Sequence, residues 1–275
     1  MSLVNATRSE LTKQFSTAMW WILGIVLVAY VGSTAAGLAA TFGAVATGAI
    51  GGDSAGAPPL PEEILPPVIY SLATAVGYVF PLLIGVIVVT GEFRHQTLTP
   101  TFLATPRRGV ALGGKLVAGT VLGLLYAALA IVVTVGPGAG LLAAFGVDTK
   151  LDDSDIWAMI GRMVIAFVLW MLIGIGVGTL VRNQVAAVVG VIAFTQFLEP
   201  ILRTVGGFVD GVTDVVRWLP GAASDALVGA SIYTSFMGAQ ADDQIAWWAG
   251  GLVLLGYAVV LLVAGYLFSW RRDVS

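Results

Sequence analysis

The sequence predicts an all-α integral membrane protein with six transmembrane helices, from run length, composition and charge placement. A helix rises ~1.5 Å per residue, so roughly 20 apolar residues cross a ~30 Å hydrocarbon core. Five charge-free runs reach about that length, and the run at 183–198 gains Ile201 and Leu202 beyond Glu199. The other charge-free runs are 14–52, 64–91, 116–147, 163–181 and 244–270. We number the predicted spans one to six.

Composition supports one membrane domain over residues 1–275. The chain is 58% hydrophobic and only 11% charged, with a mean hydropathy of +0.94. A soluble domain would carry about 25% charged residues. No polar stretch is long enough for a separate soluble domain. Because the chain has no cysteine, disulfides, thiolate metal sites and cysteine nucleophiles are excluded.

The distribution of basic residues predicts cytoplasmic N- and C-termini. With this orientation nine of the thirteen basic residues lie inside, as the positive-inside rule predicts. The inner residues are Arg8, Lys13, Arg94, Arg107, Arg108, Lys115, Arg182, Arg271 and Arg272. The outer ones are Lys150, Arg162, Arg203 and Arg217.

Residues 1–16 are expected to form an amphipathic interfacial helix, and a frayed, solvated N-terminus is the alternative. Thr7 and Glu10 have capping-box spacing. Val4, Leu11 and Phe15 would share one face, with Arg8 and Lys13 available for lipid head groups.

Span one is predicted at 17–40. A cleaved signal peptide is the alternative for this segment, but its apolar region is longer than the core of a typical signal peptide.

Span two is predicted at 67–90. Gly77, Pro81 and Gly85 share one of its faces, and Pro81 should kink the helix. The kink is either a moving hinge or a static packing feature, and the sequence leaves both open.

Residues 91–115 form the one sizeable inner loop and are chemically the most varied segment. Short helices broken at Pro100 and Pro106 are expected there. Loops held by a rigid scaffold tend to carry function.

The remaining spans are separated by short turns and two outer segments. Span three is predicted at 111–135, ending at Gly136-Pro137-Gly138, and span four at 156–181, with close packing at Gly174, Gly176 and Gly178. The outer acidic patch Asp148, Asp152, Asp153 and Asp155 lacks calcium-loop spacing, so we expect a solvated face. Residues 200–243 should hold two short helices on or in the outer leaflet. Span six is predicted at 245–270, before the stop Arg271-Arg272.

No catalytic constellation emerges from the sequence. The segment 109–116 nearly matches a phosphate-binding loop, but Leu116 stands where a hydroxyl should hold Mg²⁺. The single histidine, His95, cannot build a histidine-rich metal site and is expected to be a loop contact.

The order of these parts resembles the permease subunit of ABC-2 type bacterial ABC transporters over nearly the whole chain. The matching pieces are Ser9-Glu10-Leu11-Thr12-Lys13, Gly91-Glu92-Phe93-Arg94-His95-Gln96-Thr97, Pro106-Arg107-Arg108 with Lys115, Leu180-Val181-Arg182-Asn183-Gln184 and Trp218-Leu219-Pro220. The chain departs from the family at His95-Gln96, where many relatives have a glycine next to the threonine.

The resemblance implies partners and site residues. Such permeases pair with a second permease, identical or paralogous, and with two cytosolic ATP-binding subunits, which hold the ATP and Mg²⁺. This chain itself would bind no cofactor and no nucleic acid. The resemblance assigns ATPase coupling to Glu92, Phe93, Arg94, His95, Gln96, Thr97, Leu98, Arg107 and Arg108. It assigns an N-terminal interface to Glu10 and Lys13, and an outer gate to Trp218, Leu219 and Pro220.

The function expected from this resemblance is ATP-driven export of an apolar or amphipathic cargo, such as a lipid, peptide or drug. The chain would then be a multi-pass protein of the bacterial plasma membrane, in contact with its lipids. An intramembrane lipid- or peptide-modifying enzyme and a non-transporting membrane scaffold are the alternatives.

Overall fold

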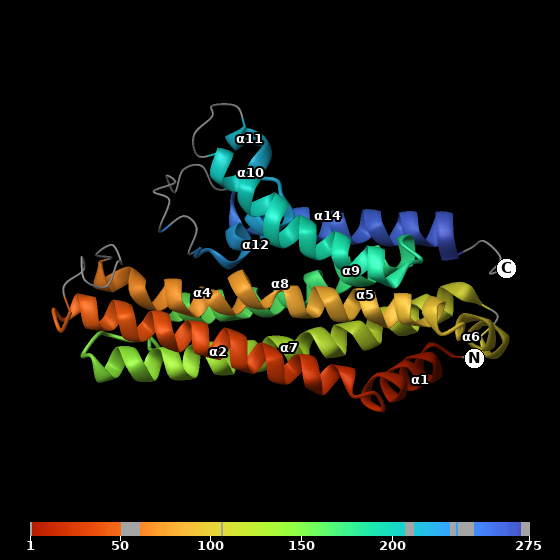
Figure 1. Cartoon of the computed structure of the whole chain (residues 1–275), viewed down its shortest axis with the longest axis horizontal. Helices are drawn as coiled ribbons and strands as arrows, with labels where there is room; N and C mark the ends of the chain where they lie inside the picture. Colours follow the sequence, from red (N-terminus) through yellow and green to blue (C-terminus); the bar gives the residue numbers. More distant parts are fainter. Residues whose placement is uncertain are drawn as a thin grey trace.

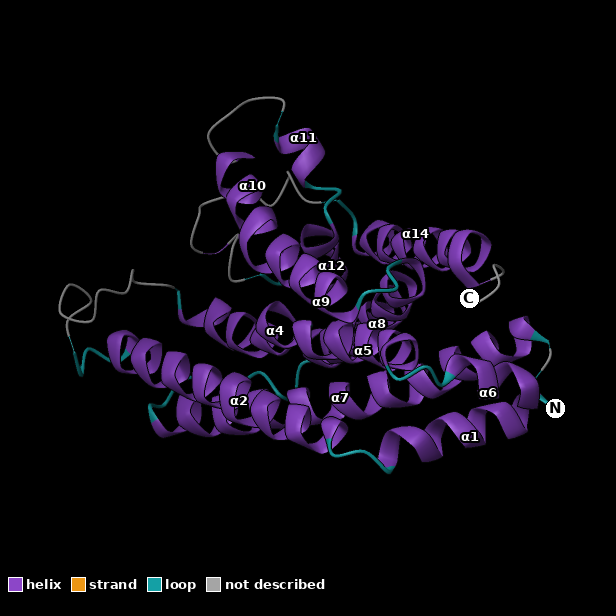
Figure 2. Ribbon diagram, turned by 45° about the vertical axis from the view of Figure 1, so that its right-hand side comes forward, coloured by secondary structure: helices purple, strands orange, loops and turns teal. Residues whose placement is uncertain are grey.

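The chain folds into a bundle of long helices that lie roughly side by side (Figures 1 and 2). The computed structural model describes residues 2–50, 61–105, 107–206, 212–231, 235 and 245–270. Pro106, Arg271 and Arg272, for which the sequence predicts a helix break and a cytoplasmic stop, lie outside the described residues, as do parts of the two outer segments.

Six helical stretches among the described residues are long and apolar enough to cross a membrane, which confirms the predicted fold class. They are α2 (Met19–Ala46), η1 with α4 and α5 (Glu62–Arg94), α7 (Arg108–Ala144), α8 (Ser154–Leu180), α9 to α10 (Gln184–Gly206) and α14 with η4 (Trp247–Trp270).

Span two is interrupted near its middle, as the proline at position 81 predicts. It consists of η1 (Glu62–Ile64), α4 (Leu65–Gly77) and α5 (Val79–Arg94), which are separated at Tyr78. Pro81 has no N–H to donate to the carbonyl four residues earlier, at Gly77, and the helix breaks there. Whether this break also moves as a hinge stays a prediction.

Span three is longer than the sequence predicts. Helix α7 continues through Pro137 to Ala144 instead of ending at Gly136-Pro137-Gly138. A proline removes one backbone hydrogen bond, and packing against a neighbouring helix can compensate for the loss. Here Gly138 lies close against Ile69 and Tyr70 of α4, so the segment beyond the proline is held in place.

Helix α8 is the centre of the bundle and packs most extensively against α5 and α14. Its glycines allow this approach, which confirms the close packing predicted for this span. A Cβ added at Gly178 would lie 2.8 Å from the Val86 carbonyl oxygen, and one at Gly176 would lie 2.7 Å from the Leu261 Cβ. A Cβ at Gly174 would collide with the Leu82 carbonyl oxygen of α5.

Helix α1 (Leu3–Phe15) confirms a helical N-terminal segment but corrects its cap and its buried face. The Ser2 side chain accepts from the Asn5 backbone N–H, so the cap lies before Thr7. The buried face consists of Ala6, Glu10 and Gln14, at helical spacing of four. The predicted apolar face is instead largely exposed, with Val4 74% and Phe15 43% exposed.

Helix α1 lies at the same end of the bundle as α6 (Leu98–Ala104) and the C-terminal end of span six (Figure 1). We call this the α6 end. The short α6 follows span two through a tight turn in which Gln96 has a φ of 54°. This left-handed conformation favours glycine, and a glutamine adopts it here.

The segment between spans five and six is more deeply packed than two helices on the outer leaflet would be. Helix α10 (Glu199–Gly206) continues span five directly, and α11 (Thr213–Val216) is a single turn. Helix α12 (Pro220–Val228) is buried along most of its length and packs against α14 and α8. A Cβ at Gly250 of α14 would lie 2.8 Å from the Leu227 backbone nitrogen.

The α5–α8 contact should tolerate no added methyl group. Gly174→Ala is expected to lower the free energy of unfolding by about 1–3 kcal/mol, because backbone atoms of α5 must move. Gly161→Ala in the same helix is the matched control, since an added Cβ meets nothing there, and alanine should stabilise the helix by up to ~1 kcal/mol. Denaturant unfolding of both variants measures the difference, and equal stabilities would contradict the packing described.

Candidate functional site

Four charged side chains from three helices meet at the α6 end of the bundle. Glu10 and Lys13 come from α1, Glu92 from the last turn of α5, and Lys115 from the first turns of α7. The Lys115 Nζ lies 2.7 Å from Glu10 Oε2 and 2.8 Å from Glu92 Oε1. The Lys13 Nζ lies 2.8 Å from Glu10 Oε1 and 3.0 Å from Glu92 Oε1. We call these residues the four-charge cluster.

The cluster is electrically neutral and largely removed from solvent. The Lys115 side chain is 0% exposed, and those of Glu10 and Glu92 are 5% and 9% exposed. A charge buried without a partner costs several kcal/mol, so such groups persist only when they neutralise one another. Each lysine contacts both glutamates, so loss of α5 or α7 would leave an uncompensated charge, and loss of α1 would divide the network into two separate ion pairs.

The local sequence explains how α1 reaches this position. Glu10 belongs to the helix face that also carries Ala6 and Gln14, and this face packs on α7. Gly114 lies directly beside the α1 backbone, where an added Cβ would be 3.0 Å from the Ala6 carbonyl carbon. The absence of a side chain there lets the two helices approach until the Lys115 ammonium reaches Glu10.

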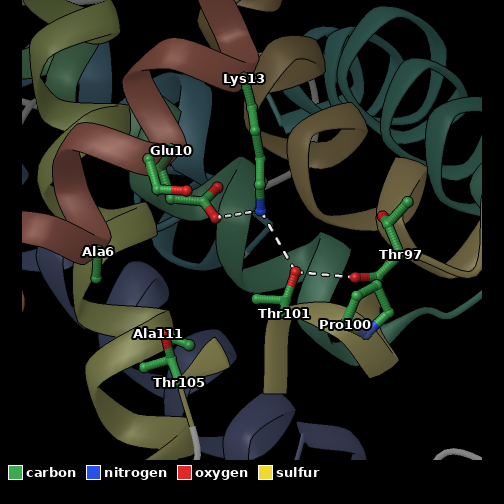
Figure 3. Close-up of a pocket in the computed structure, with 9 residues that line it drawn as sticks. Ala6, Glu10, Lys13, Thr97, Pro100, Thr101, Thr105 and Ala111 are labelled. Atoms are coloured by element: carbon green, nitrogen blue, oxygen red, sulfur yellow. Dashed lines mark hydrogen bonds and ion pairs between the residues drawn. The ribbon is translucent and has the colours of Figure 1, made fainter. Parts of the chain in front are cut away.

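Helix α6 is joined to the same cluster across a small cavity. The cavity has a volume of about 330 Å³ and lies between α1, α6 and the start of α7, lined by Glu10, Lys13, Thr97 and Thr101 among others (Figure 3). The Lys13 Nζ donates to Thr101 Oγ1 at 3.4 Å, and the Thr101 hydroxyl donates to the Thr97 carbonyl at 2.8 Å.

The Glu10 carboxyl and the Lys13 ammonium of α1 both stay charged over the neutral pH range, because oppositely charged neighbours stabilise their charged forms. Burial raises the pKa of the Glu10 carboxyl, but the Lys115 and Lys13 ammonium groups outweigh this and hold that pKa below its ordinary value of 4.5. Burial lowers the pKa of the Lys13 ammonium, but Glu10 and Glu92 outweigh this and raise it above 10.5.

A second group of contacts joins the end of span six to the same region. Trp270 Nε1 donates to the Arg108 carbonyl at 3.2 Å, and the Arg108 guanidinium donates to the Trp270 carbonyl at 3.1 Å. The Trp270 ring meets Phe102 of α6 and Phe93 of α5 edge-on, at centroid distances of 5.4 and 6.4 Å. Arg182 lies over the Phe93 ring and donates to Ser269.

The structure divides the predicted coupling residues into exposed and internal ones. Arg94, His95, Gln96, Thr97 and Arg107 are exposed at the surface of the α6 end. Arg94 makes a long contact of 3.5 Å to Gln184 at the start of α9, and His95 caps α5 through its backbone.

Two of the predicted coupling residues are instead buried. Glu92 is 7% exposed and Leu98 only 1% exposed, so neither offers its side chain to another protein. Phe93 and Arg108 are partly buried in the aromatic contacts with Trp270. Lys13 is likewise part of the four-charge cluster and is not free for lipid head groups.

The predicted gate residues lie at the start of α12. Leu219 precedes the helix, Pro220 is its first residue and is buried, and Trp218 is 46% exposed with its carbonyl accepting from the Tyr257 hydroxyl at 3.3 Å.

Sequence reasoning missed the central role of Lys115 and Thr101. The sequence puts Lys115 where the predicted inner loop and span three overlap, whereas α7 begins at Arg108 and places it two turns inside an apolar helix. A lone lysine at such a position must have a partner, and that was the available signal. Among the described residues no group of three or more histidines or acidic residues is arranged to hold a metal ion.

Removal of the central ammonium should destabilise the α6 end strongly. Lys115→Met leaves Glu10 and Glu92 facing each other with only the partly exposed Lys13 between them, which is expected to cost about 3–5 kcal/mol. Lys150→Met, at a half-buried position in the loop after α7 and remote from the cluster, is the control and should change little. Unfolding in denaturant measures both, and similar stabilities would contradict the role of the cluster.

The attachment of α1 should weaken in acid. Since the folded-state pKa of Glu10 is depressed, its stabilising contribution is present above pH 4.5 and is lost as the pH falls through the folded value. The stabilising contribution of Lys13 is present below pH 10.5 and is lost as the pH rises through its raised folded-state pKa.

A spin label on Thr12→Cys measures the attachment of α1, because the chain has no other cysteine to be labelled. The label should become mobile in acid.

The Glu10→Gln variant is the control for this titration. Its label should already be mobile at neutral pH and change little in acid. A label on the unmodified background that stays immobile well below pH 4.5 would rule out this linkage.

Comparison with known proteins identifies the family. A family model described as ABC-2 family transporter protein matches residues 44–274, from the end of α2 through span six. The matched region includes Glu92 and Lys115, whereas Glu10 and Lys13 precede it. No curated protein matches the chain. With six spans and a family match over most of its length, this multi-pass membrane protein belongs to the ABC-2 transporter family, whose members are the permease components of ABC transporters.

Proposed function

We propose that the chain is the permease subunit of an ATP-driven exporter in a bacterial plasma membrane, moving an apolar or amphipathic cargo outward. The α6 end would face the cytosol and bind a separate ATP-binding subunit, which the family implies as a partner. The positive-inside rule supports this orientation, because the arrangement of spans predicted from the sequence puts nine of the thirteen basic residues in the inner segments.

The exposed surface of α6 is the proposed contact with the ATP-binding subunit. Leu103 is 78% exposed at the end of this short helix, next to the exposed Thr99 and Pro100. A large apolar side chain that protrudes beyond the bundle gains little where it is, and it suits an apolar groove on a partner. The exposed residues Arg94, His95, Gln96, Thr97 and Arg107 at the same end of the bundle would form the polar rim.

The observation that carries the proposal is the four-charge cluster behind this surface. Lys13 bonds to α6 through Thr101 and to α5 through Glu92, and Lys115 ties both glutamates to α7. A displacement of α6 or α1 by a partner would therefore act on spans two and three together. Glu10 and Lys13 contribute to coupling from inside the permease, as links between helices.

The assembly we propose contains two ATP-binding subunits and two permeases, identical or paralogous. Its ATP and Mg²⁺ belong to the partner subunits. Apolar side chains along α2, including Ile22, Ile25 and Tyr30, are 45%, 59% and 54% exposed, and this face suits lipid or the second permease.

Replacement of the protruding leucine tests the contact. Leu103→Asp should abolish co-purification with the ATP-binding subunit, because an aspartate cannot be desolvated in an apolar groove. Val215→Asp, at a 66% exposed valine of α11 far from α6, is the matched control and should keep the partner. Both variants should unfold like the unmodified chain.

Undiminished co-purification of Leu103→Asp would remove α6 as the contact. A charge reversal at Arg94 adds a second check on the same surface. Reversal at Glu92 does not serve this purpose, because it would place three positive charges against the single carboxylate of Glu10 in the buried cluster.

A further inference from the structure

Three irregular helix segments meet at one level of the bundle, remote from the α6 end. The first is the break in span two at Tyr78, sixteen residues from each end of the stretch Glu62–Arg94 and so at its midpoint. The second is η2 (Ala193–Leu198), a π-helical turn within span five. The third is the start of α12 at Pro220. Interrupted helices near mid-membrane commonly build ligand sites.

These segments enclose a polar pocket of about 130 Å³. The Tyr78 hydroxyl donates to the Thr195 carbonyl at 3.2 Å and accepts from Gln196 Nε2 at 3.2 Å. The Tyr78 ring stacks on Trp170 at 4.4 Å, and Trp170 Nε1 donates to Ser224 Oγ at 3.1 Å. The pocket is therefore held by a hydrogen-bonded frame from α5, α8, η2 and α12.

A carboxylate with a free oxygen faces this pocket. Glu199 is 2% exposed, and its Oε1 accepts from the backbone N–H groups of Gly221 and Ala222 at 2.6 and 3.1 Å. Its Oε2 is buried and has no hydrogen-bond partner among the described residues. An unpartnered buried carboxylate oxygen is costly, so its presence points to a ligand that is absent from the protein alone.

The charges around the pocket do not cancel. Arg203 pairs with Asp225 at 2.5 Å, and the Ser231 hydroxyl also donates to the Asp225 carboxylate at 2.6 Å. Among the described residues that line the pocket, with Glu199 included, two are carboxylates and one is a guanidinium, a formal charge of −1. The four-charge cluster, in contrast, is neutral. The polar pocket is thus suited to one additional cationic group.

An apolar groove of about 310 Å³ adjoins the polar pocket. Leu82, Val191, Phe194 and Leu261 are among its lining residues, together with Trp170. Thr195 lines both spaces, and Pro220 of the groove is bonded to Gly221 of the pocket. An apolar chain in the groove would therefore place its head at the Glu199 carboxylate.

We propose that the groove and pocket form a binding site for an amphiphile with a primary ammonium head and an alkyl tail. The ammonium would donate to Glu199 Oε2 and to neighbouring oxygens of Asp225 and Tyr78, and it would neutralise the excess charge. The binding site itself is argued from the pocket and groove alone. The further statement that such an amphiphile is the cargo rests on the proposed export function.

Binding of matched amphiphiles to the full-length permease in nanodiscs, without the ATP-binding subunit, tests the site. The probes are dodecylamine, which is a cation at neutral pH, and the uncharged dodecanol, each measured against protein-free nanodiscs. Glu199→Gln keeps an amide oxygen that can accept from Gly221 and Ala222 but removes the charge. It should weaken dodecylamine binding by at least about tenfold and leave dodecanol unchanged.

Two further variants separate the contribution of the ammonium head to binding from that of the alkyl tail. Glu63→Gln, at an exposed carboxylate remote from the pocket, should leave the affinity for both probes unchanged. Gly190→Leu should weaken both probes alike, because it fills the groove at a position where an added Cβ meets nothing. This variant is expected to fold normally for the same reason.

Equal dodecylamine affinity in Glu199→Gln and the unmodified chain would overturn the site. A parallel loss of both probes in Glu199→Gln would also overturn it, since Glu199 would then be only a helix cap. Failure of dodecylamine to bind the unmodified chain would overturn it in favour of a groove closed by lipid or a second permease. Dodecylamine binding without stimulation of ATP hydrolysis in the full complex would uphold the site and contradict the export function alone.

Discussion

Two lysines and two glutamates neutralise one another at a place that water scarcely reaches, and the arrangement of the α6 end depends on this mutual neutralisation. Buried ion pairs contribute little net stability, because desolvation consumes most of the attraction. Their effect is on geometry, since any departure of one member leaves another charge unpaired. Helix α1, which has few apolar contacts with the bundle, is positioned mainly by Glu10.

The rest of the bundle combines rigid and interrupted parts. Glycines of α8 bring its backbone against α5 and α14, and such contacts leave little room for sliding. Span two is broken at Tyr78, next to the α5 segment that packs on α8, and span five contains a π-helical turn at the same pocket. The two interrupted spans thus both line the polar pocket.

Span two connects the two polar regions of the protein. Its last turn contributes Glu92 to the four-charge cluster, and its midpoint contributes Tyr78 to the polar pocket. Helix α5 between them is regular and packs on α8 over its length. A shift imposed at the cluster would therefore reach the pocket through one helix, which gives the proposed coupling and the proposed binding site a physical connection.

The sequence by itself determined the number of spans and the helical class, because hydropathy acts locally along the chain. It did not determine that Glu92 faces inward or that α12 is buried, since helix rotation depends on which faces find a partner. Span three passed Pro137 because α4 supports it, and Lys115 became central because Gly114 admits α1. Only the tertiary structure could decide these points, because each depends on contacts between residues far apart in the chain.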